Sequence, residues 1–282
     1  MFLLTLWVVS RSLFGGHYID KGACPPMSSF QYHQFLYGAD NYGVLMHDPE
    51  TGQTAAIDAG DLDSYLQAIA ETGWTLSHIL VTHHHPDHTD GLTKLAQQTG
   101  AAIFGPSGDR PIHQCIETVL SDGEQFDFAG HTVQVIATPG HTLDMLNFYL
   151  PQQAVCFTGD TLFALGCGRI FEGTPEMMWA SLEKLMKLPP ETLIYSSHEY
   201  TAANARFAVT VDPDNTALMK RVQAVEALRA DKQPTVPSLL SEELATNPFL
   251  RAGDPTIRQH LDMSDADDKA VFGEIRARKD NF

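Results

Sequence analysis

Val-Thr-His-His-His-Pro-Asp-His-Thr-Asp-Gly, residues 81–91, is the stretch of sequence from which the fold can be predicted outward. It directly follows an apolar run at residues 79–81 that predicts the end of a buried strand. Side chains alternate along an extended chain, so His83 and His85 should point in one direction and His84 in the other. We therefore expect His83 and His85 to bind one metal ion.

Two more metal donors follow in the same loop. Pro86 restricts the residue before it to extended backbone, and Asp87 and His88 then fall at the beginning of the next expected helix. A carboxylate and an imidazole in that position can bind a second metal ion. A polar loop without a function would not explain this stretch, because nothing structural requires four histidines directly after a core strand.

Three further expected strands end beside a histidine or an aspartate. They end near residues 137, 157 and 196, and His141, Asp160 and His198 follow them. Strand ends at one rim of a sheet are where α/β folds place their chemistry, so these side chains should meet those of residues 83–88. A histidine that only packs in the core would instead be expected inside the apolar pattern.

The spacing of apolar and turn-forming residues predicts alternating strands and helices as far as residue 199. We expect strands at 30–36, 42–47, 54–57, 101–104, 125–128, 132–136, 146–150, 154–157 and 193–196, and helices at 61–72, 89–98 and 174–188. Strand patterns stop near residue 200, and helices are expected at 214–230, 238–245 and 265–278. The sequence thus predicts an α/β domain at 27–199 and an all-helical domain at 200–282 that packs against it.

Composition excludes several classes of protein. The 282 residues are 43% hydrophobic and 19% charged, as in an ordinary soluble globular protein. A net charge of −17 without a basic stripe disfavours a nucleic-acid partner. The four cysteines lack C-x-x-C spacing, which favours reduced thiols in the cytoplasm.

Residues 1–26 are interpreted as a dispensable N-terminal extension. Their apolar run at residues 2–9 is far too short for a membrane span, and no basic residue precedes it as in a signal peptide. Met27 could serve as a second start, because every interpretable element begins after it. Secretion remains the alternative, and we expect no contact with a membrane.

The sequence that contains these ligand candidates resembles glyoxalase II, the hydroxyacylglutathione hydrolase branch of the metallo-β-lactamase superfamily. Eight segments carry this resemblance: Thr-His-His-His-Pro-Asp-His (82–88), Thr-Pro-Gly-His-Thr (138–142), Phe-Thr-Gly-Asp-Thr-Leu-Phe (157–163), Gly-Cys-Gly-Arg (166–169), Phe-Glu-Gly-Thr (171–174), His-Glu-Tyr-Thr (198–201), Asn-Pro-Phe-Leu-Arg (247–251) and Arg-Lys-Asp-Asn-Phe (278–282). The resemblance implies an α/β fold, an αββα sandwich followed by a C-terminal all-helical subdomain.

The resemblance also implies a ligand set for two divalent metal ions. His83, His85 and His141 match the ligands of one metal, Asp87, His88 and His198 match those of the other, and Asp160 matches the bridging carboxylate. Asp87 and Asp160 would serve catalysis together with a hydroxide that bridges the metals. Imidazole and carboxylate ligands suit Zn, but also Fe or Mn.

Five further positions match, or lie in, the glutathione-binding site of this family: Arg169, Phe171, Tyr200, Arg276 and Lys279. Arg169 stands where some members have lysine, and Phe171 where some have tyrosine, which removes a hydroxyl that could bind the tripeptide. Arg276 and Lys279 are three residues apart in an expected helix, so they should share one face and could bind a carboxylate of glutathione. A solvated basic helix end is the plainer alternative.

The resemblance implies a metal-dependent thioesterase that converts S-D-lactoylglutathione to glutathione and D-lactate, the second step of methylglyoxal detoxification. Two metals that share a water lower its pKa from 15.7 toward about 7, so no protein nucleophile is needed. The alternatives are a mononuclear iron persulfide dioxygenase of the same superfamily, a nucleic-acid hydrolase and a non-catalytic binding protein. We expect a cytoplasmic monomer whose partner is the small-molecule thioester.

Overall fold

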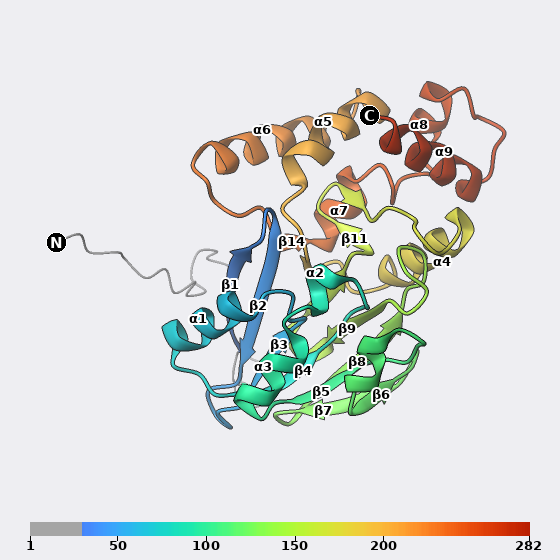
Figure 1. Cartoon of the computed structure of the whole chain (residues 1–282). Coiled ribbons are helices and arrows are strands. Elements are labelled where there is room, and N and C mark those ends of the chain that lie inside the picture. The colour runs from blue at the N-terminus through green and yellow to red at the C-terminus, as the bar shows by residue number, and fades with distance from the viewer. Residues whose placement is uncertain (1–29) are drawn as a thin grey trace, which may run out of the picture.

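The computed structural model describes residues 30–282, and two mixed β-sheets form its centre (Figure 1). The first sheet has the order β1 (Gln31–Tyr37), β2 (Asn41–His47), β3 (Thr54–Ile57), β4 (Leu76–Leu80), β5 (Ala102–Pro106) and β6 (Thr118–Leu120). Its first three strands are antiparallel, and β3 to β6 run parallel to one another. The expected strand before the histidine loop is β4.

The second sheet has the order β14 (Ser238–Leu239), β13 (Leu193–Ser196), β10 (Val155–Gly159), β9 (Leu146–Leu150), β8 (His131–Ala137) and β7 (Gln125–Phe128). All its pairs are antiparallel except β10 with β13, which are parallel. A short hairpin of β11 (Leu162–Phe163) and β12 (Gly166–Cys167) follows β10. The expected hairpin at 125–136 is therefore confirmed.

Alternating side chains divide the core into layers. In β2, Val44 and Met46 pack between the two sheets, while Leu45 between them points to the outer side of the first sheet. The layer between the sheets joins residues of both, such as Ile57 and Phe148. This arrangement is the sheet-on-sheet half of the predicted αββα sandwich.

Helices cover both outer faces. α1 (Leu62–Thr72) and α3 (Leu92–Thr99) pack on the first sheet, and α4 (Pro175–Leu185) packs on the second. Asp61 caps the N-terminus of α1, because its carboxylate accepts a hydrogen bond from the Ser64 amide at 2.9 Å, and Gly73 with φ 70° caps the C-terminus. The αββα sandwich predicted from the family resemblance is confirmed.

The prediction of a single helix at 89–98 is wrong. α2 (Pro86–Thr89) is separate from α3 because the chain breaks at Gly91, whose amide donates to the Ala59 carbonyl at 2.9 Å. A Cβ on Gly91 would lie only 2.7 Å from the Leu62 amide nitrogen, so only glycine permits this close approach. The histidine loop and α2 are thereby held against the connection between β3 and α1.

The C-terminal region is helical but differs from the expectation in detail. It contains α5 (Thr201–Val211), α6 (Thr216–Ala230), α7 (Leu240–Thr246), α8 (Pro255–His260) and α9 (Asp268–Asp280), which gather at the upper end of Figure 1 in orange and red. The sequence patterns do not predict α5 and α8. The prediction that the helix at 238–245 begins at Ser238 is wrong as well, because Ser238 and Leu239 form a short strand beside β13 before α7 starts. The prediction of a helical C-terminal region is therefore confirmed, apart from this strand of two residues.

The helices α5, α7, α8 and α9 share one apolar core with α4 and the outer face of the second sheet, while α6 packs on α5 in a smaller cluster. Trp179 of α4 packs against Phe272 of α9 with ring centroids 5.7 Å apart, and Phe249 packs against the same ring. The expectation that these helices pack on the sheet domain is confirmed. Among the described residues, no helix is long and apolar enough to cross a membrane. The predicted extension at 1–26 lies outside the described residues.

Candidate metal centre and substrate site

Seven histidine and aspartate side chains meet where strands of both sheets end. His83, His85, Asp87 and His88 follow β4 in the first sheet, while His141, Asp160 and His198 follow β8, β10 and β13 in the second. His85 is half-buried, Asp87 is exposed and the other five are buried. The cluster therefore opens to solvent on the side of His85 and Asp87.

The first group of donors consists of His83, His85 and His141. His85 Nδ1 lies 3.1 Å from His83 Nε2 and 3.0 Å from His141 Nε2. The backbone at His85 is extended, with φ −60° and ψ 145°, as the following proline requires. His84 points away and contacts Asp144, so the predicted alternation of side chains is confirmed.

The second group consists of Asp87, His88 and His198. Asp87 Oδ2 lies 3.5 Å from His88 Nε2 and 3.6 Å from His198 Nε2. Asp160 lies between the two groups, because its Oδ2 is 3.3 Å from both His141 Nε2 and His198 Nε2. Its Oδ1 is 3.5 Å from His88 Nε2. The predicted convergence of strand-end ligands is thus present in the structure.

Hydrogen bonds outside the cluster turn three imidazoles inward. His88 Nδ1 lies 2.8 Å from Asp58 Oδ2, His198 Nδ1 lies 2.9 Å from Asp40 Oδ1, and His141 Nδ1 donates to the Arg169 carbonyl at 2.7 Å. In the neutral form of each ring, Nδ1 then carries the proton and Nε2 presents a lone pair to the cluster.

Sequence reasoning missed Asp58 and Asp40. Asp58 directly follows β3, so the rule that found the other strand-end residues could have found it. It has a left-handed backbone, with φ 59°, which aspartate tolerates better than most residues. Asp40 lies in the turn between β1 and β2, and no pattern relates it to His198, which is 158 residues away.

The donor atoms are better placed to bind metal ions than to form hydrogen bonds with one another. His83 Nε2, His85 Nδ1 and His141 Nε2 point at one another, so their lone pairs repel. A single proton on His85 Nδ1 could form a hydrogen bond with only one of the other two nitrogens at a time. His88 Nε2 and Asp160 Oδ1 are buried without a hydrogen-bond partner among the described residues. Imidazole and carboxylate donors at this spacing suit Zn, Fe or Mn. The cluster is a metal-binding site.

Electrostatics separate the two groups. Burial lowers the pKa of His83, of His85 and of His141, so all three favour the neutral form that binds metal. Burial also lowers the pKa of His88, but Asp160, Asp58 and Asp87 outweigh it and raise that pKa to about 9. Burial would raise the pKa of Asp160, yet the neighbouring imidazoles hold it well below the usual value. Asp160 is therefore a carboxylate at neutral pH.

The predicted substrate residues form two sets, of which the first lies beside the metal donors. The Tyr200 ring stacks on His198 with centroids 4.7 Å apart and an interplanar angle of 2°. The Phe171 ring is 62% exposed and lies 5.2 Å from the His141 ring and 5.7 Å from the His85 ring. The Arg169 side chain is exposed, and its carbonyl accepts the bond from His141.

The second set, Arg276 and Lys279, differs in its surroundings. Arg276 is only 5% exposed, donates to the Cys167 carbonyl at 2.9 Å and pairs with Asp280 at 2.8 Å. Lys279 is half-buried, and its ammonium lies 5.3 Å from the centre of the Phe207 ring. Sequence spacing predicted a shared face but gave no sign that Arg276 is already hydrogen-bonded.

Positive charge nevertheless gathers around Lys279. Burial lowers its pKa first, and the charges of Arg276, Arg206 and Arg169 lower it further. Arg206 belongs to α5 and was not among the predicted residues. In a chain of net charge −17, this cationic group would attract an anion.

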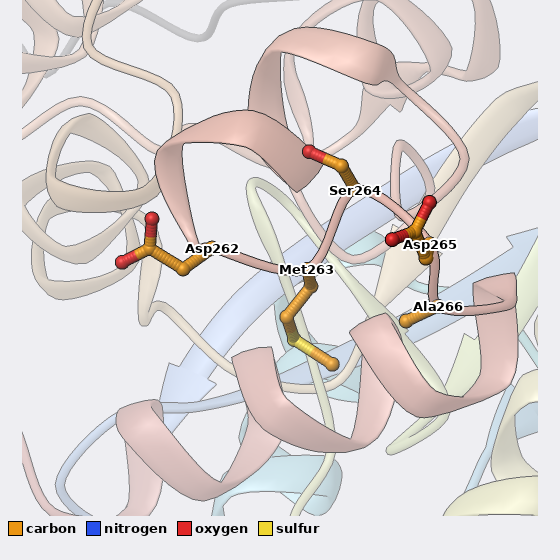
Figure 2. A pocket seen from close by; sticks show the side chains of 5 residues that line it. All are labelled: Asp262, Met263, Ser264, Asp265 and Ala266. Carbon is orange, nitrogen blue, oxygen red and sulfur yellow. The ribbon is translucent and has the colours of Figure 1, made fainter.

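Figure 2 shows a separate surface hollow in the connection between α8 and α9. It is lined by Asp262, Met263, Ser264, Asp265 and Ala266 and has a volume of about 430 Å³. None of these residues belongs to the metal cluster or to the predicted substrate residues. The hollow therefore has no part in the site.

Comparison with known proteins gives two family matches that together cover most of the chain. The metallo-beta-lactamase superfamily model matches residues 43–198, and the model of the hydroxyacylglutathione hydrolase C-terminus matches residues 199–282. A hydroxyacylglutathione hydrolase from Brucella ovis is 51% identical over 252 residues, which cover 89% of this chain and 98% of that protein.

Solved structures agree in fold. A metallo-beta-lactamase from Staphylococcus aureus subsp. aureus COL superposes with a TM-score of 0.61 at 21% identity and covers 89% of this chain and 72% of its own. The protein TTHA1623, crystallised in a di-iron-bound form, has a TM-score of 0.56 at 25% identity, with coverage of 77% of this chain and 100% of its own.

Proposed function

The chain belongs to the hydroxyacylglutathione hydrolases of the metallo-β-lactamase superfamily, and we propose that it hydrolyses S-D-lactoylglutathione with two metal ions held by its histidine and aspartate cluster. The observation that carries this proposal is the convergence of the seven donors from both sheets. The relative TTHA1623 was crystallised with two irons, which supports a two-metal centre in this fold. Family membership favours the hydrolase over a persulfide dioxygenase.

In this proposal the donors divide into two sets that share one carboxylate. His83, His85 and His141 would hold one metal, and Asp87, His88 and His198 the other. Asp160 would bridge them, because its two oxygens face histidines of both sets. When bound, such metals lower the pKa of a water toward about 7 and so supply hydroxide as the nucleophile at neutral pH.

The protein groups near the centre are consistent with a nucleophile that comes from solvent. Cys167 is the thiol beside the substrate residues, and burial raises its pKa to about 11 although Arg276 opposes this effect. It is therefore protonated at neutral pH and a poor nucleophile. The product thiol would leave as a thiolate without a protein side chain to protonate it, because the pKa of a free thiol is only about 8.5.

The substrate would lie between the open side of the metal centre and the cations around Lys279. Lys279 and Arg169 would attract the carboxylates of the tripeptide, while Tyr200 and Phe171 would flank the thioester end. Arg276 would support this site by holding the backbone at Cys167. Residues 27–199 would thus supply the metal centre, and residues 200–282 most of the glutathione site.

The direct test is hydrolysis of S-D-lactoylglutathione by the purified metal-loaded protein. The reaction is monitored through the loss of thioester absorbance and the release of thiol. Elemental analysis should give two metals per chain. One iron per chain together with oxygen uptake on glutathione persulfide would refute the proposal and favour the dioxygenase.

A further inference from the structure

A second histidine and aspartate cluster lies directly behind the metal centre. His84 Nδ1 is 3.0 Å from Asp144 Oδ1, and His113 Nε2 is 2.9 Å from Asp144 Oδ2. The three side chains are only 12%, 6% and 8% exposed for His84, His113 and Asp144. None of them belongs to the proposed metal or substrate residues.

This cluster joins loops of opposite sheets. His84 follows β4, and His113 lies in a short 3-10 helix (Pro111–Cys115) between β5 and β6, so both belong to the first sheet. Asp144 lies between β8 and β9 of the second sheet. At the base of the same loops, the Leu146 amide donates to the Thr82 carbonyl at 2.8 Å. The side-chain cluster therefore adds a second connection nearer the metal donors.

Glu172 extends the connection to the substrate loop. Its Oε2 accepts a hydrogen bond from the Leu143 amide at 2.9 Å, and its Oε1 lies 3.5 Å from His84 Nε2. The Glu172 and Phe171 amides both donate to the His141 carbonyl, at 3.3 and 3.2 Å. The chain segments that carry His85, His141 and Phe171 are thus fixed to one another.

The hydrogen bonds of His113 indicate that the cluster is a hydrogen-bond relay and not a third metal site. The Arg110 amide donates to His113 Nδ1 at 3.0 Å, so that nitrogen must present its lone pair. A neutral His113 then carries its proton on Nε2 and donates it to Asp144. A metal at Nε2 would require the proton on Nδ1, where it would face the Arg110 amide hydrogen.

We propose that His84, Asp144 and His113 are positioning residues that hold His85 against His141 and thereby set the affinity for the metal bound by His83, His85 and His141. This inference rests on the two-metal centre proposed above. It is specific to one metal, because His88 and His198 are oriented by Asp58 and Asp40 instead. Removing hydrogen bonds that orient metal ligands typically weakens metal binding about 10–100-fold.

The test uses Asp144→Asn in the full chain. The amide oxygen can accept from only one imidazole, and the other contact is kept only if that ring moves its proton to its far nitrogen, so the charged acceptor that holds both rings is lost in either case. Chelator competition should show that one zinc ion binds about 10–100-fold more weakly while the other changes less than about twofold. A crystal structure at limiting zinc should show that the weakened position is the one beside His85 and His141.

A double-mutant cycle tests whether the residues act as one unit. Because His84→Asn and Asp144→Asn break the same hydrogen bond, the double variant should lose about as much zinc affinity as either single variant. His33→Asn is the control, since His33 contacts Glu71 at 3.6 Å on the opposite part of the first sheet. It should change the melting temperature without changing either zinc affinity.

Three results would overturn the inference: unchanged zinc affinities in Asp144→Asn, equal weakening of both ions, or a third zinc in the wild type that Asp144→Asn removes. If Asp144→Asn does not fold, His113→Asn breaks the relay from its outer end and should weaken the same ion. Failure of the wild type to bind two metals would instead refute the proposed function, so the two failures can be told apart.

Discussion

Replacing Lys279 by alanine should separate substrate binding from chemistry. The ammonium of Lys279 is half-buried near Arg276, Arg206 and Arg169, whose charges lower its pKa. A bound carboxylate would relieve the repulsion among these cations, so in its proposed role the lysine would contribute to binding the tripeptide and not to the reacting bond. We expect the KM for S-D-lactoylglutathione to rise while kcat stays within about twofold.

The size of the effect follows from the exposure of Lys279. A hydrogen bond to a charged group contributes about 1.5–3 kcal/mol when buried, and a fully exposed ion pair about 0–1 kcal/mol. Lys279 lies between these limits, so we expect a loss of about 1–2 kcal/mol. That loss corresponds to a KM about 5–30 times higher.

The assay is steady-state hydrolysis with the tripeptide thioester and with a small thioester that lacks glutathione. Arg278→Ala is the matched control, because Arg278 lies on the same helix and pairs with Glu274 at 2.7 Å, away from the substrate residues. Its KM should not change. An unchanged KM in Lys279→Ala, or an equal loss on both thioesters, would refute a role of this lysine in glutathione binding.

Four further predictions concern stability, the metals and the N-terminus. Arg276→Ala should lower the free energy of unfolding by about 1–3 kcal/mol, visible in the melting temperature, because it removes the bond to the Cys167 carbonyl. Asp160→Asn should lose most activity and bind fewer than two metals by elemental analysis, since the carboxylate proposed to bridge the metals is gone. Metal binding needs neutral His88, whose pKa in the metal-free protein is raised to about 9 by its carboxylates against the effect of burial. Zinc binding at pH 7 should therefore release a proton, and zinc affinity should rise up to about pH 9; calorimetry in buffers of different ionisation enthalpy measures this, and uptake without proton release would contradict it. Deleting residues 1–26 should leave melting temperature and activity unchanged, because the first strand that the sequence predicts begins only at residue 30.

The strand-end rule accounts for most of what the sequence could predict about the site. It placed His141, Asp160 and His198 near the histidine loop because a polar residue after an apolar strand is visible in a single sequence. It did not reveal the hydrogen bond from His198 to Asp40, since contacts between distant turns leave no periodic signal. Ligand candidates could thus be predicted, and the same rule could have found Asp58, which follows β3 and orients His88, but it could not have found Asp40.

The missed helix α5 has a similar physical cause. Its buried side begins with Thr201, Asn204 and Ala205, which are small or polar, and Phe207 and Val211 are the only large apolar residues on that side, so the apolar stripe of this helix is weak in the sequence. Tertiary contacts supply what the pattern lacks: the Asn204 amide, for example, donates to the Ala164 carbonyl at 3.1 Å. Helices that pack through small residues and hydrogen bonds are therefore hard to predict from hydrophobic periodicity.

The metal centre and the sandwich depend on each other. The donors after β4 and those after β10 and β13 lie on different sheets, and Asp40 of the first sheet orients His198 of the second at 2.9 Å. The donors can therefore converge only when the sheets have packed. Packing in turn buries His88 Nε2 and Asp160 Oδ1 without a partner among the described residues, a cost that a bound metal would remove. Metal binding should for this reason stabilise the contact between the two sheets as well as supply the chemistry.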